Sequence, residues 1–260
     1  MAELREERRG RALWLTIDRE GQRNALSFTL LAELREALAR ADDDASVGAI
    51  CLTGAGEKAF CAGMDFAASA AAVQAGPLAA HEGRRSYAEL LASMARLGKP
   101  VVACVNGAAL GGGLGLLAAC DLAVAADDAR FGTPEVDVGI FPYMALAPLG
   151  RLIGRRAALE LMLTGRKIDA AEARAIGLLN VVAPRAQLVQ RTAELLETLC
   201  QKSPVALRLG RRAFYATQDL PYAQQLEALC AQLSLNAQAE DAAEGVAAFL
   251  EKRKPDFKGR

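Results

Sequence analysis

The chain has 260 residues, enough to bury one large hydrophobic core or a core domain with an appendage. Hydrophobic residues make up 52% of the sequence and aromatic residues only 5%, and the formal net charge is zero. This composition favours a helix-rich α/β protein, and it shows neither the basic footprint of a nucleic-acid-binding protein nor an acidic tail.

Membrane, secretion and metal signals are absent from the sequence. No apolar run reaches the length of a membrane span, and the first ten residues are charged and lack the apolar stretch of a signal peptide. The six cysteines are scattered and form no Cys-x-x-Cys pair, so neither a zinc site nor a disulfide framework is predicted. We therefore expect a reduced cytoplasmic protein that binds no metal and does not act at a membrane.

Apolar strands alternate with amphipathic helices in the first hundred residues. Strands are predicted at residues 12–17 and 47–53, followed in the second case by a loop over residues 54–66. Ser27 fits the N-cap of one helix, and a second helix is expected over residues 79–97. Three aspartates, Asp42 to Asp44, are interpreted as a solvated turn. The alternation favours a right-handed β–α spiral with partly parallel strands.

The most informative segment is NGAALGGGLGLLAACD, residues 106–121. An apolar strand at residues 100–105 is predicted to lead into the glycines of this segment, and an apolar helical stretch follows them. Glycines between a strand and a helix let backbone N–H groups approach a ligand at the positive end of the helix dipole. Such a site holds a phosphate or the oxygen of a polarised carbonyl. With no side-chain nucleophile nearby, the carbonyl is the hypothesis to test.

The pattern after Leu149 is almost wholly helical. Asp169 and Glu172 form a plausible capping box, and Ser203-Pro204 and Pro221 punctuate the last helices. Helices are predicted at residues 155–163, 169–177, 185–201, 204–217, 221–237 and 240–252. We expect a core over residues 1–200 and a helical region over residues 201–260. The latter is too small and too apolar to be a free domain, so it should pack on the core or on a neighbouring subunit.

Four features together resemble the crotonase (enoyl-CoA hydratase/isomerase) family. They are AFCAGMDF at residues 59–66, the glycine segment, FGTPE with Glu135, and the C-terminal EKRKPDF. The resemblance extends from RNALS, residues 23–27, to the C-terminus. It implies a crotonase-type β–α spiral with a helical C-terminal region, a homotrimer or a hexamer of two trimers, and an acyl-CoA thioester substrate. Coenzyme A is then part of the substrate, and no separate cofactor is expected.

The resemblance also implies roles for individual residues. The backbone N–H groups of Met64 and Gly112 correspond to the family's oxyanion hole, which stabilises the enolate oxygen formed when a proton leaves carbon 2. Glu135 corresponds to a family catalytic glutamate. Substrate or coenzyme A contacts are implied for further residues, of which the last two reach a neighbouring subunit's coenzyme A: Arg23, Ala62, Met64, Phe66, Gly111, Gly115, Tyr143, Phe249 and Lys252.

One departure from the family pattern bears on the reaction. Hydratases of the family carry a second glutamate where this chain has Gly115. Hydration needs one group to activate water and another to manage the proton at carbon 2, and each is worth about 10²–10⁴-fold in rate. A single carboxylate suffices to move a proton between carbons 2 and 4, so an enoyl-CoA isomerase is predicted. The missing side chain at Gly115 is also expected to leave room for a larger acyl chain.

Other functions stay open from the sequence. Within the family they are a hydratase that uses one glutamate, a decarboxylase, for which Tyr143 offers a hydroxyl, and a catalytically weak acyl-CoA binder. A dinucleotide-binding protein is disfavoured, although Gly113, Gly115 and Ala118 match G-x-G-x-x-A. The preceding strand ends at Val105, too early for the tight strand–turn–helix geometry of that motif.

Overall fold

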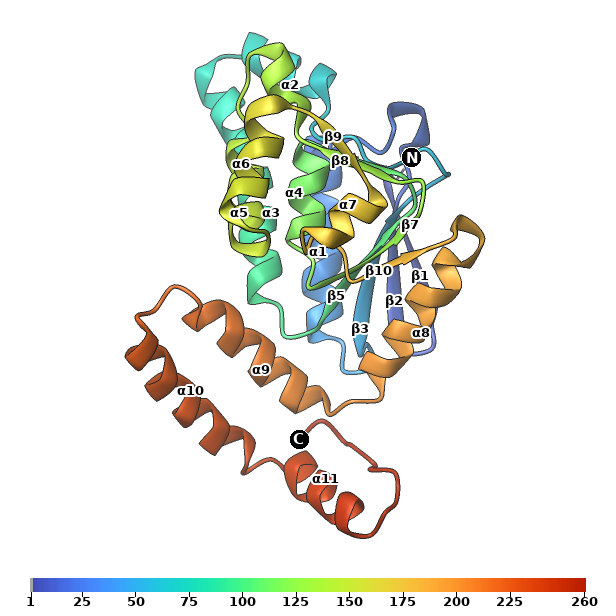
Figure 1. The fold of residues 1–260 in the computed structure, drawn as a ribbon, viewed down its shortest axis with the longest axis vertical. Coiled ribbons are helices and arrows are strands. Elements are labelled where there is room, and N and C mark those ends of the chain that lie inside the picture. The colour runs from blue at the N-terminus through green and yellow to red at the C-terminus, as the bar shows by residue number, and fades with distance from the viewer. Residues whose placement is uncertain (1) are drawn as a thin grey trace.

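The computed structural model describes residues 2–260 (Figure 1). The chain follows a spiral path and forms two β-sheets. The larger sheet has the order β1-β2-β3-β5-β7-β10 and the smaller one the order β4-β6-β8-β9. Each turn of the spiral places a strand in the larger sheet and then one in the smaller: β3 and β4, β5 and β6, β7 and β8. The α/β fold and the predicted spiral are therefore confirmed.

All strand pairs are parallel except β1 with β2 and β8 with β9. The larger sheet comprises β1 (Leu4–Arg9), β2 (Ala12–Ile17), β3 (Ala49–Gly54), β5 (Val101–Val105), β7 (Leu122–Ala126) and β10 (Val181–Ala183). The smaller sheet comprises β4 (Ala59–Cys61), β6 (Ala108–Leu110), β8 (Arg130–Gly132) and β9 (Lys167–Asp169).

Helices cover both faces of the larger sheet. On one face lie α1 (Phe28–Asp43) and α3 (Pro77–Arg96), and on the other lies α8 (Leu188–Cys200) (Figure 1). Successive side chains of β2 point to opposite faces, so Leu13 and Leu15 pack in the core beneath α1, whereas Trp14 packs toward α8. The other helices of the spiral are α2 (Phe66–Gln74), α4 (Gly112–Ala118), α5 (Tyr143–Leu152), α6 (Arg155–Thr164) and α7 (Ala170–Ala175), with short 3-10 turns η1 (Glu20–Gln22), η2 (Pro134–Val138) and η3 (Arg185–Gln187).

The structure corrects several predictions. The 54–66 loop contains β4, and β6 separates β5 from the glycines, so the strand of residues 101–105 does not lead directly into them. The region after Leu149 contains β9 and β10 besides its helices. Asp42 was predicted to lie in a solvated turn, but it also has a structural contact. Its carboxylate accepts hydrogen bonds from the backbone nitrogens of Gly98 at 2.7 Å and Lys99 at 3.1 Å. It thereby ties the end of α1 to the end of α3.

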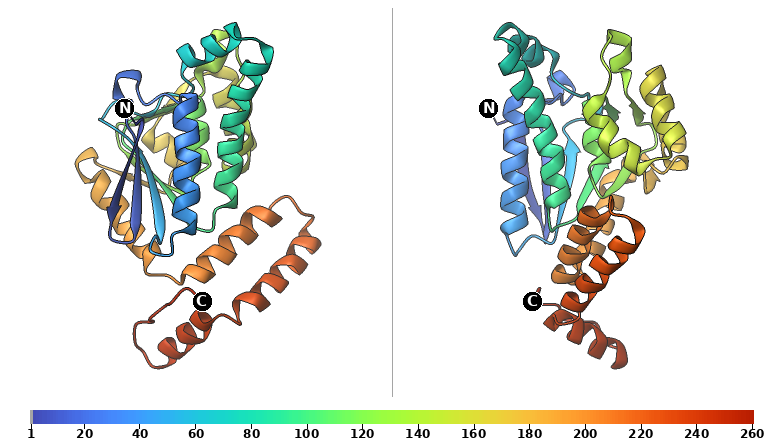
Figure 2. Two further views of the ribbon diagram at one scale, coloured as in Figure 1. Left: turned by 180° about the vertical axis from the view of Figure 1, so that it is seen from behind. Right: turned by 90° about the vertical axis from the view of Figure 1, so that its left-hand side faces the viewer.

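Three C-terminal helices form an arm that projects from the spiral (Figure 2). They are α9 (Pro204–Thr217), α10 (Tyr222–Asn236) and α11 (Glu240–Leu250). Arg211 anchors α9: its Nε lies 2.8 Å from an Asp121 carboxylate oxygen, and its Nη2 donates to the Met94 carbonyl at 2.8 Å. The boundary near residue 200 falls between α8 and α9, and its meaning as a domain boundary stays a prediction.

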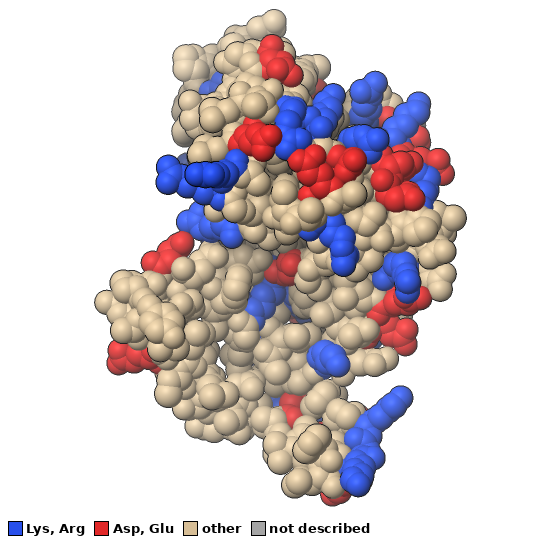
Figure 3. Space-filling view, viewed as in Figure 1, with Lys and Arg blue, Asp and Glu red and all other residues tan. Residues whose placement is uncertain are grey.

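The arm presents an apolar surface. No residue of α10 is buried, and Leu226, Leu233 and Leu235 are 50%, 68% and 55% exposed. In Figure 3 charged side chains crowd the upper part of the visible face, whereas the surface over α10 carries few of them. An apolar face of this extent on a helix is typical of a surface that another chain covers.

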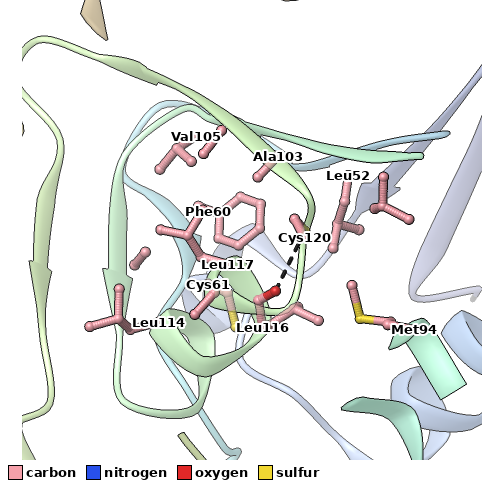
Figure 4. Packing of buried hydrophobic residues seen from close by; sticks show 14 of the residues in the cluster. Leu52, Phe60, Cys61, Met94, Ala103, Val105, Leu114, Leu116, Leu117 and Cys120 are labelled. Atoms are coloured by element: carbon pink, nitrogen blue, oxygen red, sulfur yellow. Dashed lines mark hydrogen bonds between the residues drawn. The ribbon is translucent and has the colours of Figure 1, made fainter. Parts of the chain in front are cut away.

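The main core includes α4 together with side chains of both sheets, α1 and α3. Leu114, Leu116 and Leu117 of α4 are buried beside Phe60 and Cys61 of β4 (Figure 4). Every residue of α4 is buried, so this short helix is fixed by packing on all sides. Burial raises the pKa of the Cys61 thiol to about 12, which keeps it protonated and makes it a packing residue. The glycine segment is thus carried by a rigid element.

Candidate active site

The backbone N–H groups of Met64 and Gly112 lie side by side at the start of α4. A Cβ atom placed on Gly112 would lie 3.5 Å from the backbone nitrogen of Met64. A short parallel bridge holds the Met64 strand, with Leu26 N donating to the Gly63 carbonyl at 2.8 Å and Asp65 N to the Leu26 carbonyl at 3.0 Å. Within residues 2–260, neither the Met64 nor the Gly112 N–H donates a hydrogen bond. Two N–H groups on adjacent backbone segments are therefore without an acceptor among the described residues.

Two buried asparagines hold the loop that leads to Met64. Asn24 donates from its side-chain nitrogen to the carbonyls of Ala55 at 2.9 Å and Ala59 at 2.7 Å. Asn106 donates to the Gly56 carbonyl at 2.7 Å and accepts from Gly54 N at 3.1 Å. Residues 56–58 of this loop are exposed, so these amides fix the polar turn that precedes β4. Both lie in segments named for the family resemblance, Asn24 in RNALS and Asn106 in NGAALGGGLGLLAACD.

Glu135 lies over the glycine segment. Its turn, η2, follows Thr133, whose buried hydroxyl donates to the Leu161 carbonyl at 2.9 Å. The carboxylate approaches Gly111 so closely that a Cβ atom there would lie 2.7 Å from Oε1 of Glu135. Gly111 also has a φ of 54°, which a residue with a side chain rarely adopts. Only glycine at position 111 therefore allows the Glu135 carboxylate to lie this close to the start of α4.

The Glu135 carboxylate carries the features of a proton acceptor. Its Oε2 is buried and has no hydrogen-bond partner within the described residues. Burial raises the pKa of this carboxyl above the ordinary glutamate value. A buried polar atom without a partner is rare in proteins and indicates a ligand or a reacting group at that point. Asp137, two residues on, is exposed and turned toward Gly165.

The space above Gly115 is filled, which corrects the expectation of a roomier pocket. A Cβ atom on Gly115 would lie 2.6 Å from the hydroxyl oxygen of Tyr87 and 3.0 Å from Ala145. The hydroxyl donates a hydrogen bond to the Gly112 carbonyl. The volume that a second glutamate would enter is thus occupied by a phenol and a methyl group. Sequence reasoning missed Tyr87, because α3 and α4 are distant in the chain and no motif joins them.

The remaining candidate residues are distributed over several loops and helices. Ala62 is half-buried and donates its N–H to the Arg23 carbonyl at 3.1 Å, while the Arg23 side chain is exposed. Phe66 opens α2 and Tyr143 opens α5, and each is 70% exposed. Phe249 and Lys252 lie at the end of α11, far from α4 of the same chain (Figure 1). Any contact of theirs with an active site must therefore involve a neighbouring subunit.

The described residues, 2–260, contain no group of three His, Cys, Asp or Glu side chains arranged to hold a metal ion. No helix among them is both long and apolar enough to cross a membrane. The six cysteines are all free thiols.

The sequence matches the family description "Enoyl-CoA hydratase/isomerase" over residues 7–260. The chain belongs to the enoyl-CoA hydratase/isomerase family. It is 36% identical to the 2,3-dehydroadipyl-CoA hydratase of Escherichia coli K12, over 100% of both chains. It is 35% identical to a short-chain-enoyl-CoA hydratase of Clostridium acetobutylicum, over 98% of this chain and 97% of the relative.

Solved structures agree with the family assignment. The crystal structure of an enoyl-CoA hydratase from Bacillus anthracis superposes with a TM-score of 0.94 at 34% identity, covering 99% of this chain and 100% of that one. A Mycobacterium smegmatis enoyl-CoA hydratase gives a TM-score of 0.92 at 34% identity, covering 98% of both chains. The crotonase-type spiral with a helical C-terminal region, expected from the sequence, is thus confirmed, and the chain is an enzyme of the enoyl-CoA hydratase/isomerase family.

Proposed function

We propose that the protein binds an acyl-CoA thioester and stabilises its enolate between the N–H groups of Met64 and Gly112. The observation that carries the proposal is the buried Oε2 of Glu135 near two backbone N–H groups, none of which has a hydrogen-bond partner among residues 2–260. A thioester oxygen placed between the two donors gains negative charge when carbon 2 loses a proton. Each donor aimed at that developing charge is worth about 10²–10³ in rate.

The reaction is a shift of a double bond from carbons 3 and 4 to carbons 2 and 3. Glu135 takes the proton from carbon 2, and the electrons of that C–H bond form the enolate, with its charge on the thioester oxygen. When the enolate collapses, its electrons form the double bond between carbons 2 and 3, and the old double bond opens toward carbon 4. The protonated Glu135 then returns the proton to carbon 4. No second acid or base is needed, which agrees with the filled space above Gly115. A base with a raised pKa is well matched to both halves of this cycle.

A hydratase is the second candidate, because the relatives named above are described as hydratases. In that case Glu135 would have to activate water and manage the proton at carbon 2 alone. Decarboxylation with Tyr143 as a hydroxyl donor has less support, since that side chain is 70% exposed and its ring lies 5.3 Å from Phe141.

The coenzyme A part of the substrate is assigned to the residues that the family resemblance indicates. Arg23 and Ala62 lie in the loops around Met64, and Phe66 begins α2. Phe249 and Lys252 would contact the coenzyme A of a neighbouring subunit. This assignment requires an oligomer, and we propose a homotrimer or a hexamer of two trimers. The apolar surface of α10 supports it.

A substrate screen tests the proposed function. Purified protein is assayed with enoyl-CoA thioesters of varied chain length, each with its double bond at carbon 2 or carbon 3. The proposal expects turnover of 3-enoyl-CoA to the 2-enoyl isomer. Loss of that turnover in Glu135→Gln, with thioester binding retained, is the second expected result. A protein that binds no acyl-CoA contradicts the proposal.

A further inference from the structure

Tyr87, a buried residue of α3, contacts the carbonyl of Gly112, whose N–H is one of the two proposed oxyanion donors. Tyr87 is 1% exposed, and its hydroxyl donates to the Gly112 carbonyl. Within residues 2–260, no other side chain bonds to the backbone of Gly111, Gly112 or Gly113. Gly111, the residue before α4, has no capping side chain either. Gly111 precedes α4 and donates its N–H to the Gly132 carbonyl at 2.8 Å, and Gly112 and Gly113 begin the buried helix. Within residues 2–260, the Tyr87 phenol is thus the one side chain that bonds to this backbone.

Tyr87 stays protonated in this position. Burial raises the pKa of its hydroxyl well above the ordinary tyrosine value, and the nearby Cys61 and Glu135 raise it further. A tyrosine hydroxyl has a single proton to donate, and here the Gly112 carbonyl accepts it. Tyr87 is therefore not free to donate a proton to a substrate, and any effect it has on catalysis passes through Gly112.

Tyr87 and Gly115 are complementary in shape. The hydroxyl oxygen lies where a side chain on residue 115 would begin, since a Cβ atom there would be 2.6 Å away. A glutamate at position 115 and the observed Tyr87 bond thus exclude one another without a rearrangement. Where a second glutamate side chain would begin at position 115, this chain has the Tyr87 phenol, bonded to the Gly112 carbonyl.

We propose that Tyr87 is a positioning residue: its bond to the Gly112 carbonyl holds the Gly112 N–H in line with the Met64 N–H. The inference rests on the proposed function, because it assigns Tyr87 a part in the same oxyanion hole. A restraint of this kind matters most when charge develops on the thioester oxygen. It should therefore act on kcat more than on KM.

The test uses Tyr87→Phe, which keeps the ring and removes the donor. We expect kcat to fall about tenfold, as for one lost hydrogen bond, with KM changed less than about twofold. Cinnamoyl-CoA serves as a spectroscopic probe, because polarisation of its carbonyl moves the absorption band of the bound thioester to longer wavelength. Tyr87→Phe should reduce that band shift at saturating probe.

Tyr215→Phe is the matched control. It also removes one phenol hydroxyl with a defined bond, from Tyr215 of α9 to the Asp121 carboxylate at 2.8 Å, which does not involve Gly111, Gly112 or Gly113. It should lower stability but leave the band shift and kcat as in the unaltered protein. A donor-retaining variant, Tyr87→4-aminophenylalanine, should restore part of the band shift. This variant carries the test if Tyr87→Phe fails to fold.

The outcomes separate the two proposals. Unchanged kcat and band shift in Tyr87→Phe overturn the role of Tyr87 and leave the oxyanion hole standing. Equal losses in Tyr87→Phe and Tyr215→Phe also overturn it, since they would indicate a general effect of stability. If the unaltered protein produces no band shift and no turnover of any enoyl-CoA, the proposed function fails and the role of Tyr87 fails with it.

Discussion

The Arg19 guanidinium lies 2.8 Å from the Asp65 carboxylate, and each side chain is only 13% exposed. A second nitrogen of Arg19 lies 2.8 Å from Glu3. The other oxygen of Asp65 accepts the backbone N–H groups of Ala67 at 2.9 Å and Ala68 at 3.1 Å, which caps α2. Arg19 and these N–H groups hold the pKa of Asp65 below its ordinary value. Asp65, next to Met64, is thus tied through Arg19 to Glu3, the residue before β1.

Replacing Asp65 should therefore affect both stability and catalysis. Asp65→Ala removes the cap and leaves Arg19 short of one partner, and we expect the free energy of unfolding to fall by about 1–2 kcal/mol. Because the Met64 N–H is no longer fixed, kcat should fall as well. Denaturant unfolding and steady-state kinetics measure the two effects. The control is Asp18→Ala, which breaks an exposed ion pair with Arg5 and should change neither quantity appreciably.

The raised pKa of Glu135 predicts two pH effects. A base must be ionised, so kcat/KM should fall as the pH drops through the Glu135 pKa, at a higher pH than an ordinary glutamate would give. The folded state also binds this proton more tightly than the unfolded state. Stability is therefore lost as the pH rises from the ordinary value of 4.5 through the raised pKa.

Glu135→Gln should remove that pH dependence of stability. The variant is expected to be more stable than the unaltered protein above the Glu135 pKa and to lose its advantage below pH 4.5, because it has no charge to bury. Thermal unfolding across this range compares the two proteins. A variant less stable than the parent at neutral pH would show that the charge of Glu135 is satisfied in the folded state.

Gly115→Ala should destabilise the protein, although alanine is the better helix former. The added methyl group would lie 2.6 Å from the Tyr87 hydroxyl, and overpacking of this kind costs about 1–3 kcal/mol. The same change at Gly210 of α9, where no atom lies within 4 Å, should instead be neutral or stabilise by up to about 1 kcal/mol. For the same reason Gly115→Glu is not expected to create a hydratase. Equal stability of Gly115→Ala and the parent would contradict the packing described for Tyr87.

The apolar arm should be an interface. We expect light scattering at micromolar concentration to give the mass of a trimer or a hexamer. Leu233 is 68% exposed on α10, so Leu233→Asp should shift the protein toward smaller species without unfolding it. A stable monomer of the unaltered protein would contradict the proposed oligomer. Phe249 and Lys252 would then have no neighbouring subunit whose coenzyme A they could contact.

Local chemistry made much of the fold predictable. Ser27 was predicted to cap α1, and its hydroxyl accepts the Leu30 N–H at 3.0 Å. The helix predicted at residues 204–217 has those bounds, because Ser203 caps it and Pro204 begins it. By contrast β4, β6, β8, β9 and β10 have three residues each, too few to show a period in the sequence. β1 was missed because it is a charged edge strand with one buried residue.

Some residues of the candidate site could likewise be predicted from the sequence, and others could not. Met64, Gly112 and Glu135 belong to motifs that can be matched to a family, so the sequence identified them as candidates. Two supporting residues, Tyr87 and Arg19, do not belong to such motifs, and Asp65 lies within AFCAGMDF but was not identified as a candidate. Tyr87, Arg19 and Asp65 act through contacts between segments distant in the chain, and only the tertiary structure brings those partners together. Gly115 shows the consequence most clearly, since its missing side chain predicted free space and the structure fills that space from α3 and α5.

The central claim is that one carboxylate, Glu135, moves a proton on an enolate-stabilised thioester. The most direct measurement compares, with the same purified protein, the isomerisation of a 3-enoyl-CoA and the hydration of the 2-enoyl-CoA of equal chain length. We predict that isomerisation is the faster reaction and that Glu135→Gln slows it by about 10²–10⁴-fold while thioester binding persists. Rapid hydration by the unaltered protein, or isomerisation that survives Glu135→Gln, would contradict the single-base mechanism.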